Sequence, residues 1–485
     1  MNPLKPANSI FKNTFFSGLT ALSNIGYFLL ALLAARKLGG TDYGKFCFAL
    51  SFVTLFEVLI SSGFSRLMIR EVARDRSNVR IYVDNILPMM MLSSAFAIIV
   101  IFVVAGFQQS SPDGRLAVQI LGVSMVFKTF SFFFRSLFRA YEIFQWETFT
   151  TLVERVSLLV AGTVALYAGF GLVGLCSVFP IIRGLNLLLT VFMVSKMVVA
   201  PRLAWDWGAW KKIVRRSIPF ALTAVTFTMY YRIDTIMISF LKGDKEVGWY
   251  NAAYQLIEGL ILVATVVSPV VFVRFSVLYV RSQESLKSLF EKVSRYLLAI
   301  AVPISVLGVI LAPKGILFLY GSQYLASGLA LQTMIVGTVF IFLRILCGTL
   351  LGAVDRQTVY LKIVGASLVL NVATNFFLIP RYGAFGASIA TLLTETIMGV
   401  VLFTAAAGKD GMSLKILKFG GKPLLASITA GGVVLLLRNF HVVLLSMAGA
   451  ITYLGTLSLI KFWTVDEMSA LKEKVHLMLA GQKSM

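Results

Sequence analysis

The stretch PFALTAVTFTMYYRIDTIMISF, residues 219–240, decides the fold that this chain is expected to adopt. Its roughly 22 mostly apolar residues are long enough to cross a bilayer core of about 30 Å as a helix. Arg232 and Asp234 lie well inside the stretch. An ionised side chain at mid-membrane costs about 2.5–3.5 kcal/mol on insertion scales, so it normally faces other protein or a water-filled cavity. The stretch therefore predicts a membrane span that carries a functional face.

The two charges of this span point in different directions. Four polar side chains recur at spacings of four, three and four residues and so share one helical face: Thr228, Arg232, Thr235 and Ser239. Asp234 lies about 200° around the helix from Arg232. We expect one face to line a cavity and the other to pack against a neighbouring helix.

The composition of the whole chain is that of a polytopic membrane protein. Its 485 residues are 58% hydrophobic and 14% charged, with a mean hydropathy of +0.86, whereas soluble domains carry roughly 45–50% apolar and 25% charged residues. The 44 Lys and Arg residues exceed the 22 Asp and Glu residues. Such an excess is typical of loops held on the cytoplasmic side, and the chain offers no soluble basic face for nucleic acid.

Apolar windows of about 20 residues, separated by charged or Gly/Pro turns, predict about fourteen transmembrane helices. They cover residues 14–35, 44–66, 81–107, 115–135, 148–170, 171–195, 216–241, 248–273, 296–320, 325–352, 358–380, 383–406, 421–437 and 441–463. The Arg- and Lys-rich loops follow the second, sixth, eighth and twelfth spans, which places both termini in the cytoplasm. For the last two segments, a re-entrant pair is an alternative.

Two loops recur in the two halves of the chain. Residues 38–46 (LGGTDYGKF) match residues 241–250 (LKGDKEVGWY), and residues 167–171 (YAGFG) match residues 382–386 (YGAFG). Each half then holds six spans, an even number, so both halves insert in the same orientation. This predicts two six-helix bundles related by a pseudo-two-fold axis along the membrane normal, with a cavity between them.

We therefore expect an all-α polytopic membrane protein with four parts. They are an N-terminal lobe at residues 1–200, a C-terminal lobe at 201–407, an extra transmembrane helix pair at 408–463 and a cytoplasmic amphipathic tail at 464–485. Trp205, Trp207 and Trp210 precede a basic cluster, and both this segment and the tail have the mixture expected at lipid headgroups. Anionic membrane lipid is the favoured partner for both.

Basic residues inside the predicted spans are the candidates for substrate binding: Lys128, Arg183, Arg232 and Arg344. Basic groups at several depths indicate an anionic cargo, because cargo and protein charges lower each other's desolvation cost. Arginine suits a phosphate or diphosphate through its bidentate fork. For Arg183 and Arg232 a place in the cavity is favoured over a permanent carboxylate partner. For Arg155, which follows Glu154, such a pair or a headgroup contact is favoured.

Four carboxylates inside the spans are candidates for ion coupling: Glu57, Asp234, Glu258 and Glu395. Each could form a proton or Na⁺ site, or a pair with a basic residue of a neighbouring helix. For Asp234 we favour the pair, and for Glu258 both interpretations stay open.

The sequence gives no sign of an enzyme, a cofactor or a metal site. Cys47, Cys176 and Cys347 lie far apart, and the two histidines are isolated. A Walker loop, a Ser/His/Asp or Cys/His pairing and a metal-ligand cluster are all missing from the sequence.

Five segments resemble the Wzx-type polysaccharide flippases, whose superfamily also contains multidrug extruders and lipid II flippases. They are AARKLGGTDYGKF (34–46), RIDTIMI (232–238), VGWYNAAYQL (247–256), LYGSQYLAS (319–327) and LIPRYGAFGASIATLLTE (378–395). The resemblance implies two six-helix lobes in a V and alternating access in the bacterial cytoplasmic membrane. It implies a substrate of undecaprenyl-diphosphate-linked oligosaccharide, the repeat unit of O-antigen, capsule or exopolysaccharide, with its lipid tail in the bilayer.

We therefore expect a flippase whose Arg183, Arg232, Arg344 and Lys128 bind the diphosphate, with Glu258 or Asp234 coupling transport to a proton or Na⁺ gradient. One alternative is a multidrug cation antiporter, whose cavity should be dominated by carboxylates. The other is a membrane-embedded glycan polymerase or ligase, although the predicted outer loops are short for such catalysis. Whether polysaccharide polymerase or assembly proteins bind the chain stays open.

Overall fold

The computed structural model describes residues 19–20, 23–61, 63–107, 111–407 and 412–463. Every regular element in these ranges is a helix, as predicted. The long helices are α2 (Asn24–Ser61), α3 (Phe64–Arg74), α4 (Val79–Phe107), α5 (Pro112–Ala140), α6 (Phe144–Tyr167), α7 (Gly171–Met197), α8 (Trp207–Lys242), α9 (Asp244–Arg281), α10 (Gln283–Tyr320), α11 (Leu325–Val336), α12 (Thr338–Ala353), α13 (Gln357–Ala407), α14 (Met412–Leu436) and α15 (Val442–Leu459). The predicted amphipathic tail at 464–485 lies outside the described residues.

Ten of the described helices are long and apolar enough to cross a membrane, or eleven when the bent pair α11 and α12 counts as one span. Two of the longest helices contain a break. Gly39 in α2 has φ 81° and ψ 170°, and Gly383 in α13 has φ 59° and ψ −135°. Only glycine adopts such angles readily, so each of these glycines joins two helical segments. Both breaks fall in the loops that the sequence repeat identified.

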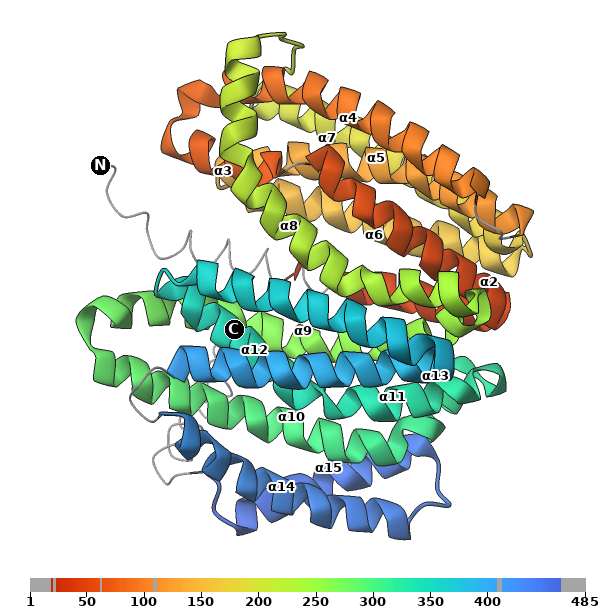
Figure 1. The fold of residues 1–485 in the computed structure, drawn as a ribbon, viewed down its shortest axis with the longest axis vertical. Coiled ribbons are helices and arrows are strands. Elements are labelled where there is room, and N and C mark those ends of the chain that lie inside the picture. Colours follow the sequence, from red (N-terminus) through yellow and green to blue (C-terminus); the bar gives the residue numbers. More distant parts are fainter. Residues whose placement is uncertain (1–18, 21–22, 62, 108–110, 408–411, 464–485) are drawn as a thin grey trace, which may run out of the picture.

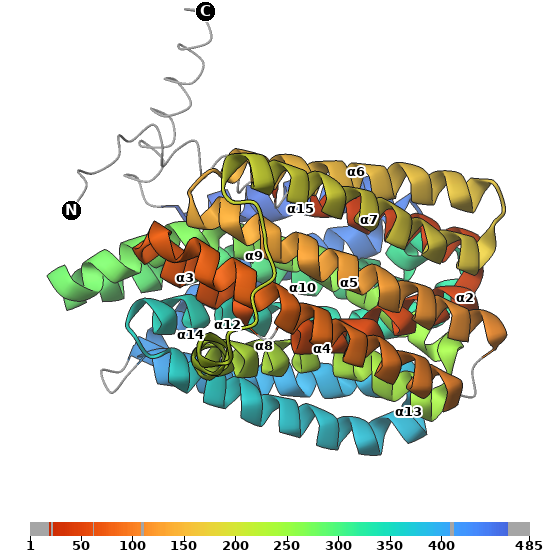
Figure 2. The same ribbon diagram turned by 90° about the horizontal axis from the view of Figure 1, so that it is seen from above.

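The helices form two groups that meet along α2 and α8. In Figure 1, α4 to α7 lie together in the upper part of the molecule and α9 to α13 lie below them. Helix α2 packs against α5 and α6 and also against α8 and α9, so it contacts both groups. Helices α14 and α15 pack on α10 at the lowest edge of Figure 1. Seen from above in Figure 2, the long helices run side by side.

The repeated loops at residues 38–46 and 241–250 touch each other through their backbones. A Cβ atom on Gly44 would lie 1.7 Å from the carbonyl oxygen of Asp244, and one on Gly248 would lie 2.0 Å from that of Gly40. The contact is reciprocal, and Gly39 and Gly243 have nearly the same backbone angles. In the predicted topology this end of the molecule faces the outside.

Hydrogen bonds within the lower group, and between that group and α2, strengthen the same end. The indole Nε1 of Trp249 donates to the carbonyl oxygen of Gln323 at 3.0 Å. The hydroxyl of Tyr324 donates to the carbonyl oxygen of Ala35 at 2.9 Å. The Arg36 guanidinium also donates to the carbonyl oxygens of Phe318 and Leu319. Close backbone contact and hydrogen bonds therefore hold this end closed.

We predict that Gly248→Ala loosens this end. Because the added methyl group meets backbone, it should cost about 1–3 kcal/mol, which changes the ratio of separated to closed molecules by about 5- to 150-fold. Cys47 lines the cavity behind the contact, so it reports the opening. In a Cys176→Ser/Cys347→Ser background, a membrane-impermeant maleimide added from outside should label Cys47 faster.

Gly432→Ala is the matched control, because a Cβ on Gly432 of α14 meets nothing within 4 Å. Its labelling rate should equal that of the parent protein. Equal rates for Gly248→Ala and Gly432→Ala would contradict a closed contact at Gly248.

Candidate functional site

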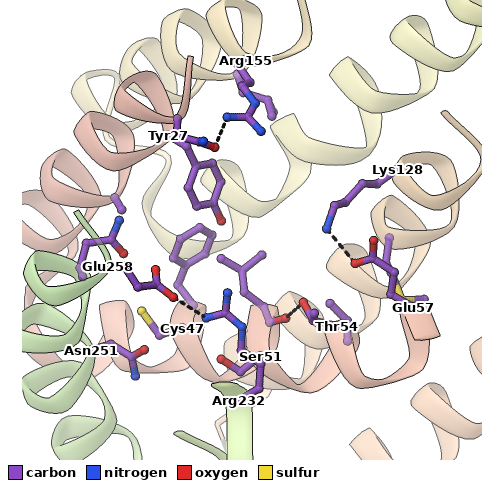
Figure 3. A pocket seen from close by; sticks show the side chains of 18 of the residues that line it. Tyr27, Cys47, Ser51, Thr54, Glu57, Lys128, Arg155, Arg232, Asn251 and Glu258 are labelled. Atoms are coloured by element: carbon purple, nitrogen blue, oxygen red, sulfur yellow. Dashed lines mark hydrogen bonds and ion pairs between the residues drawn. The ribbon is translucent and has the colours of Figure 1, made fainter. Parts of the chain in front are cut away.

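A cavity of about 260 Å³ lies between the two groups of helices. Helices α2, α5, α6 and α7 line one side of it, and α8 and α9 line the other. Tyr43, Phe46 and Cys47 are among its lining residues, next to the contact at Gly44. Figure 3 shows the side chains that point into it. The cavity therefore lies directly behind the closed end.

Seven charged side chains from six helices line this cavity: Lys128, Arg155, Arg183, Arg232, Glu57, Glu154 and Glu258. Four are basic and three are acidic. The set contains three of the four substrate-binding candidates and two of the four ion-coupling candidates from the sequence, whereas Arg344, Asp234 and Glu395 are not part of it. A multidrug cation antiporter was expected to have a cavity dominated by carboxylates, and this lining is not.

Two ion pairs stand at the edge of the open space. Lys128 Nζ lies 2.7 Å from Glu57 Oε2, and the two side chains are 40% and 21% exposed. Arg232 Nη1 lies 3.7 Å from Glu258 Oε1, with exposures of 33% and 36%. Figure 3 shows them on separate sides of the cavity. Because ion pairs this exposed contribute only about 0–1 kcal/mol, another anion can compete for either basic group.

A third carboxylate, Glu154, holds two arginines in the buried wall. Its oxygens lie 2.6 Å from Arg135 Nη2 and 3.5 Å from Arg183 Nε. The side chain of Arg135 also donates to Asn186 Oδ1 and to the carbonyl oxygen of Thr150. This network joins α5, α6 and α7, so Arg183 packs the wall as well as lining the cavity. Arg135 was not among the candidates predicted from the sequence, because it lies at the end of the predicted span 115–135.

Arg155 lines the cavity, although the sequence favoured a pair with Glu154 or a headgroup contact. Its Nη1 donates to the side-chain oxygen of Asn24 at the start of α2. In the described part of the chain, no carboxylate forms an ion pair with Arg155.

Arg344 and Glu395 lie together, away from this cavity. Arg344 Nε is 2.9 Å from Glu395 Oε2, and the side chains are only 3% and 5% exposed. The hydroxyl of Tyr230 donates to Glu395 Oε1 at 2.9 Å, and Arg344 donates to the hydroxyl of Tyr231. This cluster joins α8, α12 and α13. Arg344, a candidate for substrate binding, and Glu395, a candidate for ion coupling, therefore pair with each other between packed helices.

Asp234 faces away from Arg232, as its position on the helix predicts. It accepts hydrogen bonds from the hydroxyl of Tyr250 at 2.7 Å, from Asn375 Nδ2 at 2.6 Å and from the hydroxyl of Thr391 at 3.0 Å. No basic group pairs with it among the described residues, so the favoured interpretation of an arginine partner is wrong. Asp234 is a buried carboxylate that neutral donors surround.

Among known sequences, the family model described as "Polysaccharide biosynthesis protein" matches residues 10–279, more than half of the chain. The capsular polysaccharide biosynthesis protein CapF of Staphylococcus aureus is 24% identical over 78% of this chain and 93% of CapF. The "Probable flippase AglR" of Haloferax volcanii is 28% identical over 46% of this chain, and the match spans about half of AglR, 49% of its length.

Solved structures with a similar fold include transporters. The "Lipid II flippase MurJ, inward closed conformation" matches with a TM-score of 0.80 at 16% identity, over 92% of this chain and 98% of that one. An inward-facing multidrug resistance MATE family transporter matches with a TM-score of 0.67 at 14% identity, over 81% and 94% of the two chains. These similar folds and the apolar helices confirm the prediction of an all-helical polytopic membrane protein.

We predict that Glu395→Gln destabilises the protein, because it leaves Arg344 charged, buried and without its partner. Breaking a buried ion pair costs about 3–5 kcal/mol, whereas replacing both partners by apolar residues is often neutral. The double variant Arg344→Met/Glu395→Met should therefore be more stable than Glu395→Gln alone. Thermal unfolding in detergent micelles measures both.

Glu57→Gln serves as the control, because its partner Lys128 is far more exposed than Arg344. Its loss should cost at most about 1 kcal/mol. If Glu395→Gln and Glu57→Gln lowered the unfolding temperature equally, the structural role of the Arg344 pair would be wrong.

Proposed function

The chain belongs to the polysaccharide biosynthesis protein family, and we propose that it is a flippase that carries a lipid-linked oligosaccharide across the membrane by alternating access. Membership confirms the resemblance to polysaccharide flippases seen in the sequence. We propose undecaprenyl diphosphate as the lipid carrier and a repeat unit of O-antigen, capsule or exopolysaccharide as the glycan. The bacterial cytoplasmic membrane, with both termini in the cytoplasm, is the proposed location.

The observation that carries this proposal is the charged cavity between the helix groups. Its four basic side chains come from four different helices, α5 to α8. A soluble anion stays in water, but a lipid-linked diphosphate must pass the apolar midplane of the membrane. There its negative charge needs basic groups fixed in the protein. Guanidinium groups supply such partners through paired N–H donors. Lys128, Arg183 and Arg232 are therefore proposed to bind the diphosphate.

The closed end indicates from which side of the membrane the substrate enters the cavity. The backbone contact at Gly44 and Gly248 seals the cavity on the predicted outer side, so we propose that substrate enters from the cytoplasmic side. Release then requires the two loops to separate. Because no side chains interlock where Gly44 and Gly248 meet backbone, the loops can part once the hydrogen bonds of Arg36 and Tyr324 break.

The finer architecture is part of this proposal. We propose fourteen spans in two six-helix lobes related by a pseudo-two-fold axis, at residues 1–200 and 201–407, with an extra pair at 408–463. The breaks at Gly39 and Gly383 support this count. The reciprocal contact of the loops at Gly44 and Gly248 supports the axis.

Asp234 is the proposed ion-coupling residue. Glu57, Glu258 and Glu395 each pair with a basic residue, whereas Asp234 has only neutral donors among the described residues. A buried carboxylate without a basic partner is stable when it takes up a proton or a cation. A proton or Na⁺ bound there would neutralise a charge at the junction of α8, α9 and α13.

We predict that Lys128→Gln and Arg232→Gln each slow flipping by about 10-fold or more, because a charge-assisted hydrogen bond contributes about 1.5–3 kcal/mol. The assay reconstitutes the protein in vesicles that carry a lipid-linked oligosaccharide and measures how fast the glycan becomes accessible to an added lectin. Arg281→Gln, at the exposed end of α9, is the control and should leave the rate unchanged. Normal rates in both cavity variants would refute the proposed function.

We also predict that flipping depends on an ion gradient and that Asp234→Asn removes this dependence, because an amide neither takes up a proton nor offers a charge to Na⁺. The rate is measured in vesicles with an imposed proton or Na⁺ gradient and after its collapse. Glu57→Gln should keep the dependence. A wild-type rate that is insensitive to the collapse of both gradients would rule out coupling.

A further inference from the structure

The four basic residues of the cavity are not equally available to a substrate. Lys128 and Arg232 each lie against a carboxylate, Glu57 and Glu258 respectively. Arg183 is almost fully buried and shares Glu154 with Arg135. An anionic headgroup reaches any of these three only by competing with a carboxylate that is already in place. The cavity thus contains its own counterions.

Arg155 is different, because its partner is a neutral amide. Its guanidinium donates to the Asn24 side-chain oxygen through Nη1, and no carboxylate of the described residues pairs with it. A guanidinium has five N–H donors in a fixed fork, so donors remain for a second ligand. The Asn24 contact joins α6 to α2 and sets the direction of the side chain.

The location of Arg155 separates it from the paired groups. Figure 3 shows Arg155 on one side of the cavity, with Tyr27 between it and the pair of Arg232 with Glu258, while Lys128 and Glu57 lie on another side. The side chain of Arg155 is only partly buried, so it faces the open space. Among the four, only Arg155 offers an anion entering this space a guanidinium that no carboxylate of the described residues holds in an ion pair.

We propose that Arg155, positioned by Asn24, is the first group to bind the diphosphate of the substrate. The bound phosphates then compete with Glu258 for Arg232 and with Glu57 for Lys128. This inference rests on the proposed function and adds the order in which the cavity charges engage. It makes Arg155 a substrate-binding residue and Asn24 the residue that positions it.

Binding of farnesyl diphosphate, a short isoprenyl diphosphate, to the purified full-length protein tests this order. Arg155→Gln should weaken binding by about 10- to 100-fold, the range expected for a lost charge-assisted hydrogen bond. Arg139→Gln is the matched control, since this arginine of α5 pairs with Glu147 and does not line the cavity. Its dissociation constant should stay within about 2-fold of the wild-type value.

A conservative variant separates lost binding from lost folding. Arg155→Lys keeps the positive charge, so it should bind farnesyl diphosphate more tightly than Arg155→Gln, and the unfolding temperature of each variant shows whether it is folded. If Arg155→Gln binds as tightly as wild type, the role of Arg155 is refuted while the proposed function stands. If the wild-type protein itself binds no isoprenyl diphosphate, diphosphate recognition and this inference fall together.

Glu258→Gln tests the competition directly. The substitution removes the carboxylate that holds Arg232 at 3.7 Å, so the diphosphate no longer has a competitor there. Because the pair is loose and exposed, binding should tighten by about 2- to 5-fold. Weaker or unchanged binding in Glu258→Gln would refute the exchange of carboxylate for phosphate.

Discussion

The cost of placing charge inside a membrane organises this structure. Every basic group in a span must find a partner or an aqueous space, because the bilayer core offers neither. Glu154 meets this demand for Arg135 and Arg183 and so joins α5, α6 and α7. Glu395 does the same for Arg344 across α12 and α13. The buried pairs therefore hold each group of helices together, while the exposed pairs at Glu57 and Glu258 border the cavity.

The contact between the two groups of helices is built differently. Where Gly44 meets Asp244 and Gly248 meets Gly40, backbone touches backbone. Such a surface depends on the absence of side chains, so it is tight when closed and leaves no buried charge behind when it opens. Ion pairs fix the structure within the groups, and a backbone contact, reinforced by the hydrogen bonds of Arg36 and Tyr324, closes one end between them. This division suits a protein whose two halves move as units.

Helical periodicity predicts which side chains share one face of a helix, but not which other helix packs against that face. The opposite directions of Arg232 and Asp234 followed from helical periodicity, and the structure places Arg232 in the cavity and Asp234 among Tyr250, Asn375 and Thr391. The partners of Arg344 and Arg155 did not follow. Glu395 and Asn24 lie far from them in sequence, and periodicity carries no information on interhelical pairing. The sequence therefore identified charged residues in the spans but separated structural from cavity-lining ones only in part.

The same pairing explains how one cavity can serve both an empty and a loaded protein. A carrier must change conformation with and without its cargo, and four unpaired basic groups in an empty cavity would make the second change costly. Carboxylates beside Lys128 and Arg232 neutralise those charges when no phosphate is present. Both pairs are exposed, and the pair at Arg232 is long. A phosphate can therefore replace the carboxylate beside either basic group at a low free-energy cost. Internal counterions of this weak kind let the loaded and the empty cavity differ little in electrostatic free energy, which is the condition for a carrier to complete its cycle.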